Sequence, residues 1–254
     1  MLTIERMSEI YGLIQQNGVV RVDELAGRFR VSEMTIRRDL EKMEREGRLT
    51  RCHGGAVQRT KKSRATEDDG NLVAEHMEAK MRIAKYCFDH YVHENTVIYL
   101  DAGSTVLELA KLLPSLSDLT VVTNDVRIAG ALMNSNVEVF ILGGNLQRTQ
   151  GGIYGQMAEQ QLKNYRVDQA FVSGLCVDDS FDVFSAIESM MYFRRTLLTC
   201  ARQTFMLLDA SKLHRQSLFK INNLADYAAT VTDGSLPEEL AVRAAQAGIE
   251  WVMV

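Results

Sequence analysis

The sequence predicts an α/β protein in two parts: an N-terminal winged helix-turn-helix, called the head, and a C-terminal Rossmann-like domain, called the body. The body is expected to hold a mainly parallel sheet with helices on both faces. Two short amphipathic helices around a tight turn and a glycine-tipped hairpin predict the head, and alternating apolar runs and helical segments predict the body. We place the head at residues 1–59, a polar linker at 60–71 and the body at 72–254.

The two helices of the turn are predicted by the spacing of their apolar residues. Such residues recur at helical intervals through residues 22–30. Ser32 stands just before a second run, and its hydroxyl can cap the free N–H groups of a helix that begins there. Within that second helix, Ile36, Leu40 and Met43 fall on one face and form a buried stripe.

The opposite face of the second helix carries the residues that we expect to meet DNA. Met34 and Arg38 lie on that face, with Arg37 on its flank. A pair of arginines on a helix is more often a solvated face than a binding site, but the capped turn and the hairpin together favour DNA. Cations on such a helix suit phosphates and guanine edges in a major groove. The expected DNA contacts are Ser32, Met34, Thr35, Arg37, Arg38, Arg51 and His53.

A basic β-hairpin is expected after the second helix, as the wing of the head. Leu49–His53 and Ala56–Arg59 are short strand-like runs on either side of Gly54-Gly55, which is a strong hairpin signal. A further amphipathic helix over residues 4–14 would close the small core behind the turn.

The charges of the chain are divided unevenly between its two parts. Residues 1–64 hold 14 Lys and Arg against 9 Asp and Glu, a net charge of +5, whereas the whole chain has a net charge of −4. The remainder therefore has a net charge of −9. Only the N-terminal part should attract the phosphates of a nucleic acid.

The body is predicted by repeated strand–helix units. Amphipathic helical segments separate most of its short apolar runs, and a first helix is expected from about Leu72 to Tyr91. This alternation indicates a mainly parallel sheet covered on both faces. The predicted strands are Thr96–Asp101, Leu119–Asn124, Val137–Gly144, Asp168–Gly174, Gln203–Asp209, Tyr227–Asp233 and Ile249–Val254.

Small and polar residues gather where these strands end, at the edge where such sheets bind ligands. Taken alone, each of these loops is more often a helix cap or a turn, and their recurrence at successive strand ends is what favours a site. Glycine admits a close ligand, hydroxyl and N–H groups can hold an anion, and Lys212 offers a cation, which together suit a phosphate plus a polyol. The expected effector-binding residues are Asp101, Gly103, Ser104, Thr105, Thr123, Asn124, Gly143, Gly144, Gly155 and Lys212.

These motifs resemble those of the DeoR family of bacterial transcriptional regulators over nearly the whole chain. In the head the resemblance rests on Val31-Ser32, Thr35–Leu40 and His53–Ala56. In the body it rests on Leu100–Thr105, Val121–Asn124, Leu142–Gly144 and Leu208–Lys212. The resemblance implies a regulator of sugar metabolism, commonly a repressor. It also implies a C-terminal domain that is similar to sugar-phosphate isomerases and binds a phosphorylated sugar or related effector.

One segment departs from the family pattern. Family members often carry a Glu two to four residues before a Lys-Arg pair in the helix after the fourth strand. Here the pair is Arg194-Arg195, the run before it is Met190–Phe193, and Glu188 stands at a shifted position. This run is a candidate for an altered pocket or for an oligomer contact.

The composition argues against other kinds of partner. The spacing Cys87-x2-His90-x2-His93 superficially resembles a metal site, but it wraps off one helix face and no further ligand is near, so no metal is expected. No cofactor is expected either. No apolar run reaches the length of a membrane span, and four cysteines without paired spacing suggest the reducing cytoplasm.

Two classes of function stay open, and we prefer the first. It is a DNA-binding regulator that acts as a homodimer or homotetramer on operator DNA and binds without turnover. The alternative is an isomerase-like enzyme on sugar phosphates with an appended DNA-binding head, for which Asp101 and Asp209 are candidate bases. A weaker variant of the first is a regulator whose effector strengthens DNA binding.

Overall fold

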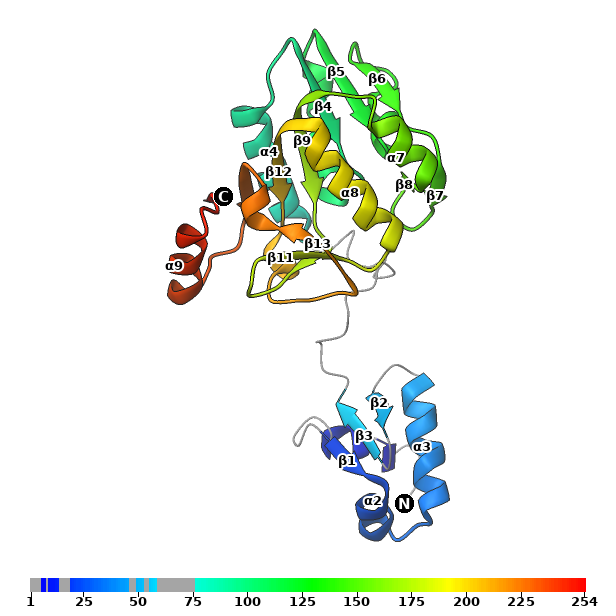
Figure 1. Ribbon diagram of the computed structural model, residues 1–254. Coiled ribbons are helices and arrows are strands. Elements are labelled where there is room, and N and C mark those ends of the chain that lie inside the picture. The colour runs from blue at the N-terminus through cyan, green and yellow to red at the C-terminus, as the bar shows by residue number, and fades with distance from the viewer. Residues whose placement is uncertain (1–5, 8, 14–18, 46–48, 53–54, 59–75) are drawn as a thin grey trace. The chain divides into compact units, whose positions relative to one another are not determined.

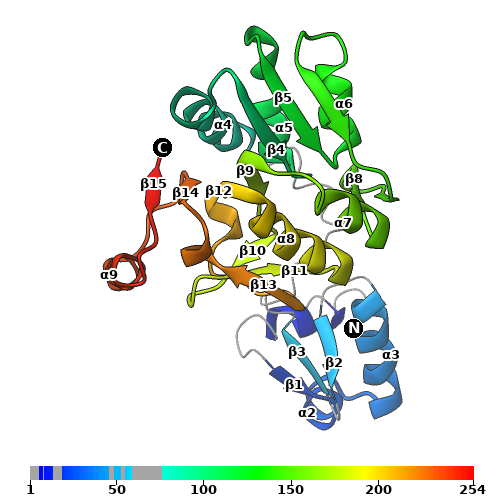
Figure 2. The same ribbon diagram turned by 45° about the horizontal axis from the view of Figure 1, so that its top comes forward.

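The structure is a computed structural model that describes residues 6–7, 9–13, 19–45, 49–52, 55–58 and 76–254. The chain divides into two compact units, Met1–Ser63 and Arg64–Val254, and each is described by itself. Figures 1 and 2 show the elements of both. The predicted linker at residues 60–71 lies outside the described residues.

The N-terminal unit has the predicted winged helix-turn-helix architecture. Residues 6–7 and 9–13 are helical. They are followed by β1 (Val19–Arg21), α2 (Val22–Phe29), α3 (Glu33–Arg45), β2 (Leu49–Cys52) and β3 (Gly55–Gln58). The strands form one antiparallel sheet in the order β1-β3-β2. The hydrophobic pattern does not predict β1, because a three-residue strand has no period of its own and depends on pairing with β3.

The core of the head confirms the predicted apolar stripe of α3. Ile36, Leu40 and Met43 are buried and pack in one cluster with Val22 and Leu25 of α2. This burial leaves the opposite face of α3 to the solvent.

The body is built on seven parallel strands, and the seven predicted runs correspond to them one to one. The strands lie in the order β15-β14-β12-β9-β4-β5-β6. Their bounds are β4 (Thr96–Leu100), β5 (Leu119–Thr123), β6 (Glu138–Ile141), β9 (Val167–Ser173), β12 (Ala201–Leu207), β14 (Ala229–Thr232) and β15 (Trp251–Met253).

Helices cover both faces of this sheet, as predicted. Alternate residues of β4 enter different cores: Tyr99 packs with α7, α8 and α9, whereas Ile98 and Leu100 pack with α4, α5 and α6. In Figure 1, α7 and α8 cover the face that is turned towards the viewer. The helices are α4 (Met77–Tyr91), α5 (Ser104–Ala110), α6 (Val126–Leu132), α7 (Gln156–Leu162), α8 (Glu188–Cys200) and α9 (Glu238–Gln246).

Two small antiparallel sheets, which the sequence pattern does not predict, lie beside the main sheet in the chain's connections. One is the hairpin of β7 (Asn145–Gln147) and β8 (Gly152–Tyr154). The other has the order β10-β11-β13. Its strands are β10 (Cys176–Val177), β11 (Asp182–Ser185) and β13 (Phe219–Asn223). Both follow directly after carboxyl ends of parallel strands, so they help to build the edge at which a ligand is expected.

Candidate functional site

The first candidate site is the exposed face of α3 in the head. The hydroxyl of Ser32 accepts the backbone N–H of Thr35 at 3.2 Å, so Ser32 caps the helix as predicted. The hydroxyls of Ser32 and Thr35 are also hydrogen-bonded to each other, at 2.9 Å. Met34, Arg37 and Arg38 are exposed. The helix therefore presents apolar and cationic side chains to the solvent from a fixed, capped start.

The two arginines of this face have different surroundings. Arg37 forms an ion pair with Glu33, one turn earlier, at 3.1 Å. Arg38 has no hydrogen bond or ion pair within the part of the chain that the structure describes. Of the other predicted contacts, Arg51 lies in β2 without a described side chain, and His53 lies outside the described residues.

A buried ion pair holds α3 in the head. The Nε of Arg6 donates to a carboxylate oxygen of Asp39 at 2.6 Å, and both side chains are almost fully buried. A buried charge pair of this kind fixes orientation, because separating the partners would leave a charge unpaired in the core. The predicted DNA contacts do not include Arg6 or Asp39, which hold α3 in place from its buried side.

The second candidate site lies in the body, at the carboxyl ends of its strands. The chain runs from β4 to β5 and β6 on one side, and it then returns to β9 on the other side of β4. Sheets of this class bind ligands at such a reversal, and the loops that meet there, after β4 and β9, are called the crevice below. The loop that begins at Asp101 follows β4, and Ser173-Gly174 ends β9. The predicted residues Asp101–Thr105 therefore lie on this crevice.

Asp101 and Arg194 form a buried ion pair at the crevice. The Nε of Arg194, on α8, donates to Oδ2 of Asp101 at 2.7 Å. The Asp101 side chain is 0% exposed and that of Arg194 is 6% exposed. Oδ1 of Asp101 is buried and has no hydrogen-bond partner among the described residues. Burial raises the pKa of Asp101 above its ordinary value, and the charge and hydrogen bond of Arg194 oppose that rise.

Arg194 is a site residue that the sequence pattern does not identify as such. The run before it was a candidate for a pocket wall or an oligomer contact. Met190, Met191 and Phe193 are instead buried in the core, which leaves Tyr192 as the exposed member of the four. The helical spacing of these apolar residues is the signal that could have shown their burial.

Thr123 and Asn124 hold the loops of the crevice together. The hydroxyl of Thr123 donates to the carbonyl of Leu100 at 2.7 Å and accepts the N–H of Asp125 at 3.0 Å. Oδ1 of Asn124 accepts the hydroxyl of Tyr99 at 2.9 Å, and its Nδ2 donates to the carbonyl of Ile153 at 3.1 Å. These groups were predicted as ligand contacts, but their polar atoms are already bonded inside the protein.

The predicted glycines stand around α7 and the β7–β8 hairpin. The N–H of Gly143 donates to Oε1 of Gln161 on α7 at 2.8 Å. Gly144 and Gly155 have positive φ angles of 152° and 104° and flank the hairpin. Gly143 follows β6, which is the second strand from β4 in the sheet, so it lies about 10 Å from the end of β4, at two strand spacings. Gly144 and Gly155 flank a hairpin that lies against the loop after β4, where a Cβ added at Gly152 would be 2.7 Å from the Cβ of Ala102.

Lys212 lies beyond the end of β12, the strand next to β9. It ends a short 3-10 helix, Ala210–Lys212, which the carboxylate of Asp209 caps by accepting the N–H of Ser211 at 3.1 Å. Its side chain is half-buried, and its ammonium has no hydrogen bond or ion pair within the described residues. This is a cation that a ligand could use.

The loop that carries Lys212 is tied to the β10–β11 hairpin. The N–H of Arg215 donates to the carbonyl of Val177 at 3.0 Å, and Gln216 Nε2 donates to a carboxylate oxygen of Asp178 at 2.8 Å. These contacts hold the loop of Lys212 at the edge of the sheet where the carboxyl ends of the strands lie.

Replacing Gly103 with alanine is expected to lower the stability of the body. A Cβ built at Gly103 would lie 2.8 Å from the Cβ of Ser173, so β4 and β9 would have to separate. Overpacking of this kind costs about 1–3 kcal/mol in the free energy of unfolding. The control is Gly130→Ala on α6, where an added Cβ meets nothing within 4 Å and a helix gains up to about 1 kcal/mol. Urea unfolding followed by the fluorescence of Trp251 measures both, and equal stabilities would contradict the close approach.

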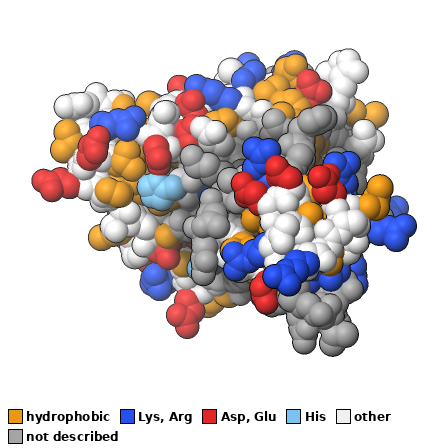
Figure 3. Space-filling view, turned by 90° about the horizontal axis from the view of Figure 1, so that it is seen from below, with side chains coloured by type: hydrophobic (Ala, Val, Ile, Leu, Met, Phe, Trp, Pro, Cys, Tyr) orange, Lys and Arg blue, Asp and Glu red, His pale blue; other side chains and the backbone are white. Residues whose placement is uncertain are grey.

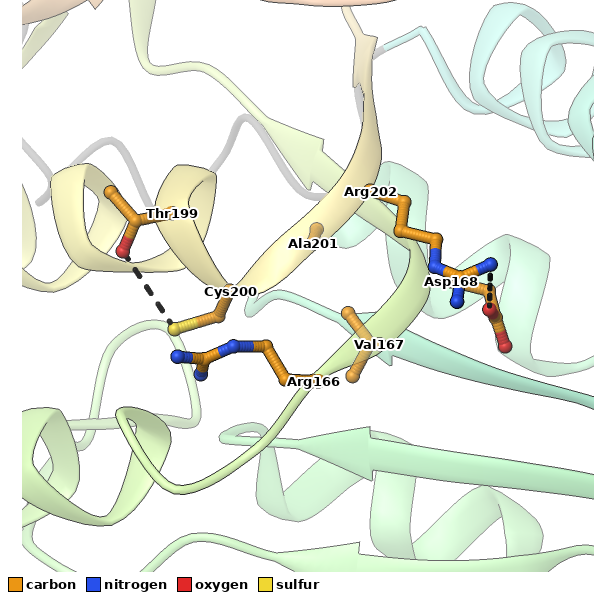
Figure 4. A pocket seen from close by; sticks show the side chains of 7 residues that line it. All are labelled: Arg166, Val167, Asp168, Thr199, Cys200, Ala201 and Arg202. Carbon is orange, nitrogen blue, oxygen red and sulfur yellow. Dashed lines mark hydrogen bonds and ion pairs between the residues drawn. The ribbon is translucent and has the colours of Figure 1, made fainter.

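A separate pocket lies at the opposite end of the sheet, where β9 and β12 begin (Figure 4). It has a volume of about 330 Å³ and is lined by Arg166, Val167, Asp168, Thr199, Cys200, Ala201 and Arg202. Arg202 is 3.7 Å from a carboxylate oxygen of Asp168, and Arg166 donates to the backbone carbonyls of Lys163 and Tyr165. The guanidinium of Arg202 stays largely exposed beside this pocket, whereas that of Arg166 is held by backbone carbonyls.

The described residues show no cluster of three or more His, Cys, Asp or Glu that could hold a metal ion. Cys87 is buried in the core, whereas His90 is exposed and stacks on Tyr86 with ring centroids 3.9 Å apart. No helix within the described ranges is both long and apolar enough to cross a membrane.

Comparison with known proteins matches both parts of the chain. Residues 6–62 match the family model described as a DeoR-like helix-turn-helix domain, and residues 75–234 match the DeoR C-terminal sensor domain. The chain is similar to the L-fucose operon activator of Haemophilus influenzae, with 33% identity over 89% of this chain and 90% of the relative. It is also similar to the HTH-type transcriptional repressor CsqR of Escherichia coli, with 28% identity over 98% of this chain and 94% of the relative.

The likeness to solved structures is weaker. A D-ribose-5-phosphate isomerase in complex with phospho-erythronic acid is 19% identical, and the match covers 54% of this chain and 53% of the isomerase, with a TM-score of 0.40. A likeness at this level supports no conclusion about activity.

Proposed function

The chain belongs to the DeoR family of transcriptional regulators, and we propose that it represses a sugar or sugar-acid catabolic operon under the control of a phosphorylated-sugar effector. The effector site of this proposal is the crevice at the carboxyl ends of β4, β9 and β12. The observation that carries it is the buried Oδ1 of Asp101, which has no partner among the described residues. One curated relative is named for an L-fucose operon, which supports a sugar as the signal.

A polyol hydroxyl of the effector would be a hydrogen-bond donor to Oδ1 of Asp101. An unsatisfied buried carboxylate oxygen carries a penalty of a few kcal/mol, because it has lost water and gained no donor. Arg194 supplies a donor to Oδ2 alone, so a ligand hydroxyl that donates to Oδ1 would remove the penalty. Sugars and sugar acids offer several such hydroxyls. In this arrangement Arg194 positions Asp101, and Asp101 contacts the effector.

Lys212 supplies the charge for the anionic end of the effector. Its ammonium is unpaired within the described residues and sits on a loop that is anchored to the β10–β11 hairpin. A lysine is a compact cation that binds phosphate as a point charge. Asp101 and Lys212 together would thus recognise a hydroxylated anion, which is the chemistry of a sugar phosphate.

Control of DNA binding follows from coupling between this crevice and the paired heads. A homodimer or homotetramer that assembles through the bodies would present two heads to repeated or palindromic half-sites. An effector that binds one arrangement of the bodies more tightly shifts the population towards it and changes how the heads match the DNA. A preference of only ~1.4 kcal/mol changes the equilibrium tenfold.

The isomerase alternative is less well supported. Isomerisation of a sugar phosphate needs a carboxylate that is free to move a proton beside the carbonyl of the sugar. The carboxylate of Asp209 caps its own loop, and Asp101 is held in a buried ion pair by Arg194, with only Oδ1 left for a ligand hydroxyl. We therefore expect no turnover of sugar phosphates by the purified chain, and a measurable rate that Asp101→Asn removes would favour the enzyme.

Replacing Lys212 with alanine is expected to weaken effector binding roughly 10- to 100-fold, since a hydrogen bond to a charged group contributes about 1.5–3 kcal/mol. A thermal-shift screen with sugar phosphates and sugar acids would identify the effector, and titration of the hit would give the affinity of each variant. Lys85→Ala on α4, which removes a surface lysine paired with Asp89, is the matched control. An unchanged affinity in Lys212→Ala would reject its role.

The direction of control is tested with the same hit on DNA from upstream of the chain's own gene. A repressor that an inducer releases should lose its retarded band as the effector is added. A stronger band would instead show the variant in which the effector tightens DNA binding. The affinity of Lys212→Ala for DNA without effector should equal that of the unmodified chain.

A further inference from the structure

Only some of the exposed side chains of α3 are free to contact bases, because others are bonded to each other. In residues 32–38, the hydroxyls of Ser32 and Thr35 are hydrogen-bonded to each other, and that of Ser32 also accepts the backbone N–H of Thr35. Glu33 and Arg37 are held together by their ion pair. Among the exposed side chains of these described residues, Met34 and Arg38 are left without a hydrogen bond or ion pair. They are therefore the two side chains that can meet DNA without first losing a contact.

Met34 and Arg38 also lie side by side on the helix. They are four residues apart, so their side chains occupy the same face, one turn from each other. One turn rises about 5.4 Å along the helix axis, and stacked bases are about 3.4 Å apart. The two side chains can thus reach base pairs that lie within about two steps of each other.

The exposure of Met34 calls for an apolar partner. Its side chain is 62% exposed at the start of α3, although the same helix buries its other apolar residues. A thioether side chain is apolar and flexible, and it adapts its shape to the surface that it meets. In the major groove the apolar feature of the base edges is the C5-methyl group of thymine. Arg38, in contrast, matches the two acceptors of guanine, O6 and N7.

The attraction between the cations of the head and the phosphates of DNA does not select one base sequence over another. The space-filling view of Figure 3 shows Lys and Arg side chains interspersed with Asp, Glu and apolar side chains. Attraction between such cations and phosphates acts on every sequence alike. Sequence discrimination must come from individual side chains at base edges.

We propose that Met34 reads the methyl group of a thymine in each half-site, next to a guanine that Arg38 reads. The proposal rests on the proposed function, because it requires that α3 enters the major groove of the operator. It goes further by naming the base pair that an apolar side chain selects, and it predicts half-sites in which a T and a G lie within two positions of each other.

The test removes the methyl group and nothing else. The operator is first obtained by selecting duplexes that the full-length chain retains from random DNA. The selected site is then synthesised with deoxyuridine in place of each thymidine, which leaves every hydrogen-bonding group of the base unchanged. The dissociation constant of the unmodified chain should rise about fourfold for each head that loses a methyl contact, at constant salt.

Variants assign the effect to one side chain. Met34→Ala should bind the thymine operator about as weakly as the unmodified chain binds the deoxyuridine operator, and it should show little further loss with deoxyuridine. Met34→Leu should keep the sensitivity, since leucine is apolar and of similar size. Met133→Ala is the matched control: Met133 is 77% exposed but lies at the end of α6 in the body.

The outcomes separate the proposal from its premise. If the deoxyuridine operator is bound as tightly as the thymine operator, or if Met34→Ala stays as sensitive as the unmodified chain, the role of Met34 is overturned while DNA binding stands. If no duplex is retained above background, the proposed function fails, and the proposal fails with it.

Discussion

Replacing both Arg37 and Arg38 with alanine is expected to abolish operator binding. Each bidentate contact of an arginine with a guanine contributes about 1–3 kcal/mol, and contacts to phosphates add attraction that depends on salt. In the proposed dimer the substitution removes four arginines, so the affinity should fall at least roughly a thousandfold. Gel retardation or fluorescence anisotropy at one fixed salt concentration measures this loss.

The same variant should keep its fold and its effector site. Arg37 loses an exposed ion pair with Glu33, which is worth only about 0.3–0.5 kcal/mol in a helix, and Arg38 loses no described contact. The thermal stabilisation by effector should therefore equal that of the unmodified chain. Lys85→Ala/Lys111→Ala removes two positive charges from the body and controls for net charge. Should this control lose DNA binding as well, the assignment of the arginines as specific contacts would be wrong.

Replacing Arg194 with methionine is expected to destabilise the body by about 3 kcal/mol or more. The substitution removes the charge that faces Asp101, which is fully buried, and breaking one side of a buried ion pair costs about 3–5 kcal/mol. The matched control is Arg195→Met. That neighbouring arginine is exposed and donates to the backbone carbonyls of Ile221 and Lys220, so its loss should cost about 1 kcal/mol.

The stability that Arg194→Met loses should become larger as the pH rises. Burial raises the pKa of Asp101, and removing Arg194 removes the group that opposes this rise. A folded-state pKa above the unfolded value means that the folded chain binds the proton more tightly. Stability is therefore greatest below the unfolded pKa of about 3.9 and falls as the pH rises from there through the folded pKa.

A second substitution shows whether the loss belongs to the pair. In Arg194→Met/Asp101→Asn no buried charge is left unpaired, so at neutral pH at least half of the lost stability should return. Urea unfolding, followed through the single tryptophan, Trp251 in β15 of the body, measures each variant. If the double variant is no more stable than Arg194→Met, the ion pair is not the source of the loss.

The elements that could be predicted from the sequence are those whose signal lies within the element. Each of the seven strands of the main sheet is a short apolar run between helical segments, and α3 carries its apolar residues at helical spacing. Ser32 could be assigned as a cap because capping depends on a neighbouring N–H group three residues away.

The elements that could not be predicted depend on partners far along the chain. The strands β1, β10 and β11 contain at most two consecutive apolar residues and β13 is mostly polar, so they lack the apolar run that marks the main sheet and exist through pairing. The same reason explains the crevice residues. The polar side chains of Thr123 and Asn124 follow a strand end, as ligand groups do, but the neighbouring loops arrive close enough to use them internally.

The sequence by itself determined the class of protein: a winged helix-turn-helix joined to a doubly covered parallel sheet, in the DeoR family. Local periodicity, capping and ordered motifs carry that information, and the family models match the same regions. Only the tertiary structure decided which charges meet. Arg194 lies 93 positions from Asp101, and Arg6 lies 33 positions from Asp39. Such pairs form because the packing of helices and sheets buries side chains from distant parts of the chain next to each other. No local sequence pattern predicts which of them will pair.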